Sequence, residues 1–197
     1  MSQTPDGDDR EAEIRAATVG EPVRLDAPIT LVEYDPEWPR LYEREAGRIR
    51  GALGERVVGL EHCGSTAVPG LAAKPIVDMV LTVEDSADEA SYVSLLEAAG
   101  YVVRIREPEW FEHRVLKGPD TDVNLHVFSR GCAEVERMLL FRDTLRADAG
   151  ERIRYERTKR ELAARTWRYV QNYADAKSGV VEAIIARARG AQKTKRR

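Results

Sequence analysis

Long hydrophobic runs and cysteines are scarce in this 197-residue chain, and each shortage excludes a class of protein. No stretch approaches the roughly 18 uncharged apolar residues that a membrane helix requires. The opening residues, MSQTPDGDDREAE, lack the basic and apolar regions of a signal peptide. The only two cysteines, Cys63 and Cys132, make neither a disulfide framework nor a zinc ribbon. We therefore expect a cytoplasmic protein with no membrane partner.

Charged residues are plentiful but nearly balanced, with 31 Lys and Arg against 34 Asp and Glu. The balance hides an asymmetry, because residues 129–197 contain 18 basic and 9 acidic side chains. A basic segment can bind polyanions, but most such segments are solvated helix faces. The chain also lacks the aromatic-rich basic strand that stacks single-stranded nucleic acid. Nucleic acid is therefore not an expected partner.

Hydrophobic periodicity predicts an α+β fold with a mixed sheet, flanking helices and a C-terminal helical extension, because strands alternate with helices before helices accumulate. Residues 1–27 are expected to form a mobile tail with a weak helix near 11–17. A single domain follows over 28–190, with its sheet at about 28–130 and its helices at about 131–190, and a basic tail over 191–197. Strands are expected at 29–34, 57–61, 75–83, 101–105, 113–116 and 122–128. A helix is expected to run to about Leu53, with either Pro36 or Pro39 at its first position. Further helices are expected from the capping box Ser86–Glu89 to Ala99, and at about 133–147, 151–177 and 179–189.

A Gly/Ser-containing loop joins two of these strands, running from Gly64 to Lys74. It is not a P-loop, because Leu71 follows Gly70 at the place where that motif requires lysine. Gly64 permits close approach, and the loop can present backbone N–H groups and the Ser65 hydroxyl to an anion. A loop of this composition can equally be a simple connector.

Asp78 lies in the otherwise apolar strand that follows the loop. A buried carboxylate must be paired, hydrogen-bonded or bound to a metal, since burying it alone costs several kcal/mol. We expect Asp78 to bind a ligand or a metal. The alternative is that it lies at the end of the strand and caps a loop amide.

A second strand carries polar residues at alternate positions. Side chains alternate across a strand, so Asp122, Asn124 and His126 share the face opposite Val123, Leu125 and Val127. These polar groups either line a pocket or face water on a half-exposed sheet.

Lysine is unusually rare, with six lysines against 25 arginines. In such a chain each lysine suggests a need for a compact ammonium group rather than a planar guanidinium. Lys74 closes the loop, and Lys159 and Lys177 fall on one stripe of the helix expected at 151–177, where they could meet a phosphate. The alternative is that the tyrosines of this stripe form the core and both lysines reach solvent.

Together these residues resemble the GrpB family, within the polymerase-beta-like nucleotidyltransferase superfamily. The resemblance covers about residues 29–189. It rests on Trp38-Pro39, the segment 61–78, Gly100-Tyr101, Leu125-His126-Val127, the segment 141–146, and the stripe of Tyr155, Lys159, Tyr173 and Lys177.

The superfamily resemblance implies a nucleotidyltransferase-like sheet and metal-dependent transfer of a nucleoside monophosphate from an NTP to a small acceptor, with Mg²⁺ or Mn²⁺. Gly64-Ser65 is similar to the pair that holds the triphosphate, and Asp78 to the first metal-binding aspartate. Superfamily enzymes usually carry a second carboxylate two residues later, where this chain has Val80. Asp122 or His126 could supply the absent ligand, which would leave a one-metal or displaced site. The alternative is that the fold retains only anion binding.

The resemblance thus implies a site in which Asp78 and His126 are catalytic and Asp78, His126 and Asp122 hold the metal. The missing carboxylate at Val80 leaves a second function open: a non-catalytic module that binds nucleotides or coenzyme A-related compounds. Some family members are fused behind a dephospho-coenzyme A kinase, which suggests a link to nucleotide metabolism. Substrate or phosphate contacts are expected from Gly64, Ser65, Thr66, Lys74, His62, Arg114, Lys159 and Lys177.

Overall fold

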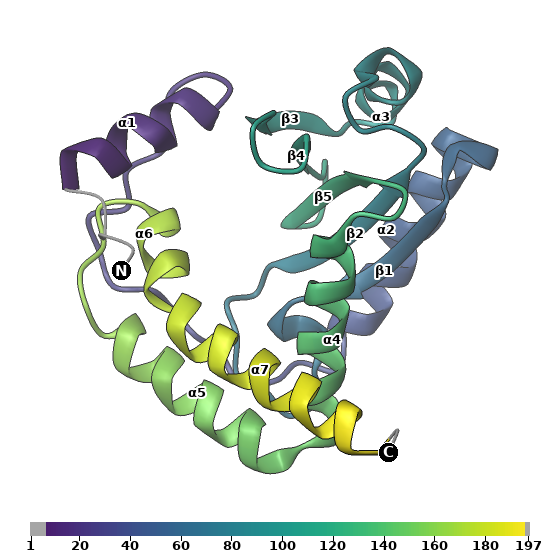
Figure 1. Ribbon diagram of the computed structural model, residues 1–197. Helices are drawn as coiled ribbons and strands as arrows, with labels where there is room; N and C mark the ends of the chain where they lie inside the picture. The colour runs from purple at the N-terminus through teal and green to yellow at the C-terminus, as the bar shows by residue number, and fades with distance from the viewer. Residues whose placement is uncertain (1–6, 196–197) are drawn as a thin grey trace.

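A computed structural model describes residues 7–195 of the chain, and its centre is a five-stranded mixed sheet (Figure 1). The strand order is β1-β2-β5-β4-β3; β2 and β5 are parallel, and every other neighbouring pair is antiparallel. This confirms the predicted α+β class with a mixed sheet. The strands are β1 (Gly59–Cys63), β2 (Val77–Val83), β3 (Val102–Glu107), β4 (His113–Lys117) and β5 (Val123–Ser129).

Seven α-helices surround the sheet within the described residues. None of them is long and apolar enough to cross a membrane in this part of the chain. They are α1 (Gly7–Ala17), α2 (Trp38–Leu53), α3 (Val93–Ala98), α4 (Ala133–Ala147), α5 (Ala149–Ala163), α6 (Val170–Ala176) and α7 (Ser178–Lys195). Short 3-10 helices occur at η1 (Gly54–Arg56), η2 (Ser65–Ala67) and η3 (Glu89–Ser91).

One face of the sheet forms the main core with α2 and α3. Strand alternation directs the apolar side chains of β2 and β5 to this face, where Met79, Leu81 and Leu125 are fully buried. The amphipathic helix α2 covers them with Ile49 and Leu53. The same alternation directs the polar residues of both strands to the opposite face.

That opposite face is only partly covered by α4, which packs on Val80 and Phe128. Helices α5 and α7 lie beyond α4 and carry α6 at one end (Figure 1). The loop between β1 and β2 fills the space between these helices, because its Val68 and Leu71 pack with Tyr155 of α5 and Ile184 of α7. The remaining area of the sheet, around β2, β5 and β4, faces a cavity.

The segment before residue 28 crosses from the sheet to the helical layer. Helix α1 agrees with the weak helix expected near 11–17 and lies beside α6 (Figure 1). Thr18 forms an isolated bridge with Ile105 of β3, and Leu25 donates its N–H to the carbonyl of Arg168 at 2.8 Å. The mobility expected for residues 1–27 stays a prediction. Residues 1–6 lie outside the described part of the chain.

Two expected elements near the sheet are wrong. Residues 29–34 form no strand of the sheet, and contain only an isolated bridge between Val32 and Ala73. The capping box at Ser86 is also absent, because the Ser86 amide and hydroxyl both bond to the Ser129 hydroxyl, each at 2.9 Å. The helix α3 therefore begins only at Val93.

The single long helix expected over 151–177 is wrong as well. It ends at Ala163, and α6 begins at Val170. Trp167 explains the break: its ring nitrogen donates to the carbonyl of Leu162 at 2.8 Å, and its backbone bridges Ala27 of the N-terminal segment. The last helix also continues to Lys195 instead of ending at 189, and the final two residues of the expected basic tail fall outside the described residues.

Candidate functional site

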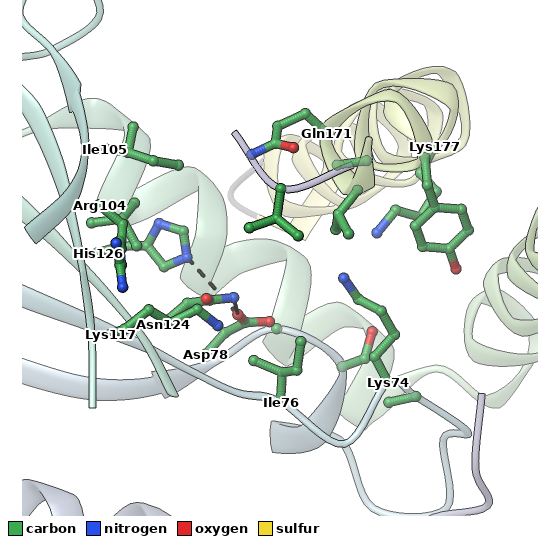
Figure 2. Close-up of a pocket in the computed structure, with 18 of the residues that line it drawn as sticks. Lys74, Ile76, Asp78, Arg104, Ile105, Lys117, Asn124, His126, Gln171 and Lys177 are labelled. Carbon is green, nitrogen blue, oxygen red and sulfur yellow. Dashed lines mark hydrogen bonds and ion pairs between the residues drawn. The ribbon is translucent and has the colours of Figure 1, made fainter. Parts of the chain in front are cut away.

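A cavity of about 710 Å³ lies between the open face of the sheet and the helical layer (Figure 2). Its volume is in the range of pockets that hold small organic ligands. The β1–β2 loop forms one wall, α5 and α6 form another, and residues 18–23 of the N-terminal segment form a third. Polar groups come from the sheet, the loop and the helices, and Leu31, Ile76 and Ile105 contribute apolar surface.

Four of the six lysines of the chain line this cavity. They come from separate elements: the loop, β4, α5 and the end of α6. Arg104 of β3 adds a fifth basic side chain, while Asp78 and Glu21 are the acidic residues that line the cavity. The cavity is therefore electropositive, which favours an anionic occupant. The four lysines are Lys74, Lys117, Lys159 and Lys177.

Lys159 is the most deeply buried of these amines, with 2% of the residue exposed. Its Nζ donates to Ser65 Oγ at 3.1 Å and to the carbonyl of Ala72, and it lies 5.0 Å from the ring centre of Tyr155. Burial and the nearby charge of Lys177 lower the pKa of Lys159 to about 7. Lys159 therefore anchors the loop and is easily deprotonated.

Lys74 and Lys177 approach the cavity from the helical side, opposite the polar residues of the sheet (Figure 2). Both amines lie near the ring of Tyr173, at 5.9 Å and 4.6 Å from its centre. Burial lowers the pKa of each lysine, and the repulsion from Lys177 lowers the pKa of Lys74 further. An anion placed between these amines would favour their charged forms, and so would oppose both the effect of burial and the repulsion between them.

Asp78 lies on the floor of the cavity, with 30% of its side chain exposed. Asn124 of the neighbouring strand donates to its Oδ1 at 2.8 Å. Burial acts to raise the pKa of Asp78; a His126 ring lowers this pKa only when it is protonated, whereas the Asn124 amide and the charge of Lys74 lower it in either state of that ring. Asp78 is therefore ionised and open to the cavity.

Gly64 is required beside this carboxylate for two reasons. Its φ angle of 67° is one that other residues rarely adopt, and a Cβ at this position would lie 2.4 Å from Asp78 Oδ2. The loop therefore closes directly over Asp78, and Ser65 and Thr66 also line the cavity.

A row of hydrogen-bonding side chains leads to Asp78 across the sheet. Glu107 Oε2 lies 2.7 Å from His113 Nδ1, and His113 Nε2 lies 3.0 Å from His126 Nδ1. His126 Nε2 then lies 3.9 Å from Asp78 Oδ1, as the dashed line in Figure 2 marks. Each residue comes from a different strand, in the sheet order β3, β4, β5 and β2.

Three residues expected at the site are not brought to it. His62 lies on the α2 side of the sheet, stacked 4.9 Å from the Tyr42 ring, with Nε2 3.1 Å from Thr66 Oγ1; burial lowers its pKa to about 4. Arg114 is on the same side and donates to Glu89 at 2.6 Å. Asp122 accepts from Lys117 Nζ at 2.8 Å and does not line the cavity.

The expected metal set of Asp78, His126 and Asp122 is therefore not assembled. Over residues 7–195 no group of three or more His, Cys, Asp or Glu side chains is arranged to hold a metal ion. Asp122 does not join Asp78 and His126, because it precedes β5 and its carboxylate pairs with Lys117 at the end of β4. Only Asp78 and His126 of the set face the cavity.

Sequence reasoning missed part of the cavity wall. Residues 18–23 carry no periodic signal, and their position depends on the bridge to β3. Lys117 and Arg104 were also missed, as were His113 and Glu107 in the row that leads to Asp78. The rarity of lysine was a usable signal for Lys117.

The sequence matches known proteins over most of its length. The family model described as GrpB protein matches residues 28–187. The UPF0157 protein of Halalkalibacterium halodurans is 60% identical over 178 residues, covering 90% of this chain and 91% of that protein. A crystal structure of the conserved protein GrpB from Enterococcus faecalis has a TM-score of 0.68 at 28% identity, covering 81% of this chain and 96% of that one.

A longer relative also contains this region. A protein named dephospho-CoA kinase from Mycolicibacterium paratuberculosis is 33% identical over 165 residues, which cover 71% of this chain but only 40% of that protein. The match to the family over residues 28–187, with the extensive identity to the Halalkalibacterium protein, shows that this chain belongs to the GrpB family.

Proposed function

We propose that the cavity binds the phosphate groups of a nucleotide or a related small molecule. The observation that carries the proposal is the convergence of four of the chain's six lysines on one cavity. Arginine outnumbers lysine about fourfold in the whole chain, yet among the described residues only one arginine, Arg104, lines the cavity, so the cavity is enriched in ammonium groups. Ammonium groups bind phosphate as compact charges that can approach from several directions.

The electrostatics of the lysines support the same proposal. Lys74, Lys159 and Lys177 all have lowered pKa values, because burial disfavours their charged forms and the charge of Lys177 further disfavours those of Lys74 and Lys159. A ligand with several negative charges would restore those charges and gain favourable interactions at once. Asp78 alone cannot neutralise three amines. A polyphosphate is therefore a better complement to the cavity than a single carboxylate.

We further propose metal-dependent nucleotidyl transfer as the reaction of this site, with a small molecule as acceptor. Asp78 favours it, because the carboxylate is ionised, exposed to the cavity and directly beneath Gly64 and Ser65. Mg²⁺ is commonly bound by one or two carboxylates together with the phosphates of a substrate. The single carboxylate fits a cation shared with the ligand. Such a cation would neutralise the phosphates and stabilise the leaving pyrophosphate.

A non-catalytic binding module is the second candidate, and Val80 favours it. This residue lies two positions after Asp78, is 1% exposed and packs with Cys63 and Phe128 under α4. A second carboxylate therefore has no place there. The dephospho-CoA kinase name of a longer relative makes coenzyme A and its precursors the natural ligands to test for this candidate.

Calorimetric titration with inorganic tripolyphosphate, ATP and coenzyme A tests the binding proposal. Lys177→Gln should weaken tripolyphosphate binding roughly ten- to hundredfold, the usual loss for a hydrogen bond between charged groups. Arg157→Gln is the matched control, because Arg157 is an exposed cation on α5 outside the cavity. Equal affinities in both variants, or no binding by the wild type, would contradict the proposal.

Pyrophosphate release separates the two candidates. Transfer predicts release from an NTP in the presence of Mg²⁺ or Mn²⁺ and an acceptor, and its loss in Asp78→Asn. The binding module predicts stabilisation by ATP or coenzyme A that a metal chelator does not change. Metal-independent affinity without turnover across all four nucleotides would exclude the transferase.

A further inference from the structure

The contacts between Glu107, His113 and His126 determine which ring nitrogens carry hydrogens. A carboxylate only accepts, so the 2.7 Å contact with Glu107 Oε2 requires a hydrogen on His113 Nδ1. In a neutral His113 ring, Nε2 is then an acceptor. The 3.0 Å contact to His126 Nδ1 must therefore be donated by His126.

The orientation of the two rings is suited to this bond. Their planes differ by 9° and their centres are 5.2 Å apart, while the facing nitrogens are only 3.0 Å apart. The nitrogens thus lie between the ring centres, so the rings meet edge to edge in nearly one plane. Phe128 stacks on His113 at 4.6 Å and Trp110 packs against it at 5.0 Å, which fixes the His113 ring.

The environment of His113 favours its neutral form. The residue is 4% exposed, and burial lowers its pKa although the hydrogen bond to Glu107 opposes the change. The same hydrogen bond lowers the pKa of Glu107, which remains a carboxylate. With Glu107 ionised and His113 neutral, every hydrogen bond in the row is donated toward Glu107.

We infer that Glu107 and His113 are positioning residues that keep the hydrogen of His126 on Nδ1, so that Nε2 presents its lone pair to the cavity beside Asp78. His126 Nε2 and Asp78 Oδ1 are then two acceptors that face each other across 3.9 Å. This separation is too long for a direct hydrogen bond and leaves the lone pair available to a donor.

This assignment gives the site a recognition element that the lysines cannot supply. Lysine ammonium groups bind the anionic part of a ligand, whereas the paired acceptors bind an electropositive part, such as a hydroxyl hydrogen. The inference does not depend on phosphate binding, because the hydrogen positions can be read in the protein without a ligand. Failure of either proposal therefore leaves the other to be judged alone.

Nitrogen-15 NMR of the labelled full chain tests the inference, because long-range proton–nitrogen correlations show which ring nitrogen carries the hydrogen. The chain has only three histidines, so His62→Gln and His126→Gln, each of which removes one pattern, assign all three. At pH 8 we expect His126 to show a protonated Nδ1 and an unprotonated Nε2. A protonated Nε2 and bare Nδ1 in the wild type would overturn the inference.

Two variants separate positioning from a merely structural role. In His113→Phe, which keeps a flat ring but removes the acceptor, the His126 hydrogen should move to Nε2. Glu107→Ala should allow both His126 tautomers, and this variant tests the inference even if His113→Phe does not fold. Glu109→Ala, an exposed neighbour in the same connection, should leave the wild-type pattern. An unchanged His126 pattern in Glu107→Ala would also contradict the inference.

Discussion

Replacing Lys159 with methionine should stabilise the protein near neutral pH and weaken its binding of tripolyphosphate. The amine is 2% exposed, and its pKa is lowered from 10.5 to about 7 because folding removes it from water. Methionine fills a similar volume without a charge. The substitution therefore removes a destabilising buried amine and one cation of the cavity together.

The size of the effect follows from the pKa. At about 1.4 kcal/mol per tenfold change, the lowered pKa of Lys159 destabilises the folded state by roughly 4 kcal/mol at pH 7. Methionine also loses the bonds to Ser65 and Ala72, and an unpaired buried carbonyl costs about 1–3 kcal/mol. We therefore expect a net gain of about 1–3 kcal/mol in the free energy of unfolding.

The pH dependence distinguishes this cause from ordinary repacking. Between about pH 7 and 10.5 the unfolded chain keeps the Lys159 proton that the folded chain has lost, so wild-type stability rises with pH. The methionine variant lacks this contribution. The advantage of the variant should thus be largest below pH 7 and shrink by roughly 2–3 kcal/mol between pH 6 and pH 9.

Urea unfolding of both proteins at pH 6 and pH 9 measures this difference, with Arg157→Met as an exposed control on the same helix. The control should follow the wild type at both pH values. The reasoning would be refuted if Lys159→Met were less stable than the wild type at pH 6, or if its difference from the wild type were the same at pH 9.

Three further substitutions test other parts of the site. Gly64→Ala should lose at least about 2 kcal/mol of stability and its tripolyphosphate binding, because its Cβ would clash with Asp78 Oδ2; Gly70→Ala, also at positive φ but with open space around it, should lose only about 1 kcal/mol and still bind. His62→Gln should lose less stability than the wild type between pH 6.5 and pH 4, as measured by urea unfolding. Over this range the unfolded wild type takes up a proton on His62, whereas the folded ring, with a pKa of about 4, stays mostly neutral. The difference costs the wild type roughly 3 kcal/mol of stability. Arg114→Met should lower thermal stability, because it removes a hydrogen bond to Glu89. Calorimetry should find that this variant binds tripolyphosphate with wild-type affinity; a tenfold loss of affinity would show that Arg114 contributes to binding.

The sheet and its polar face were predictable because they depend on local alternation. The apolar run around Asp78 indicated a buried strand, the alternation around His126 indicated a strand with one polar face, and the structure places the two side by side in parallel. The period of two then required both polar groups to share a face. The rarity of lysine pointed to Lys159 and Lys177, which do reach one cavity.

The remaining features depend on contacts between distant parts of the chain. No glycine or proline follows Ala163 to indicate that the helix ends there. The helix ends because Trp167 forms a bridge with Ala27. The same connection brings the N-terminal segment to the cavity. Ser86 resembled a helix cap but is bonded to Ser129, 43 residues away. No local pattern contains that information.

A crystal structure of the protein with inorganic tripolyphosphate tests the central claim most directly. We predict that the phosphates lie between Lys74, Lys177 and Lys159, on the side of the cavity that faces Asp78 and Ser65. Tripolyphosphate bound instead to the basic surface of the C-terminal helices, with this cavity holding only water, would contradict the account.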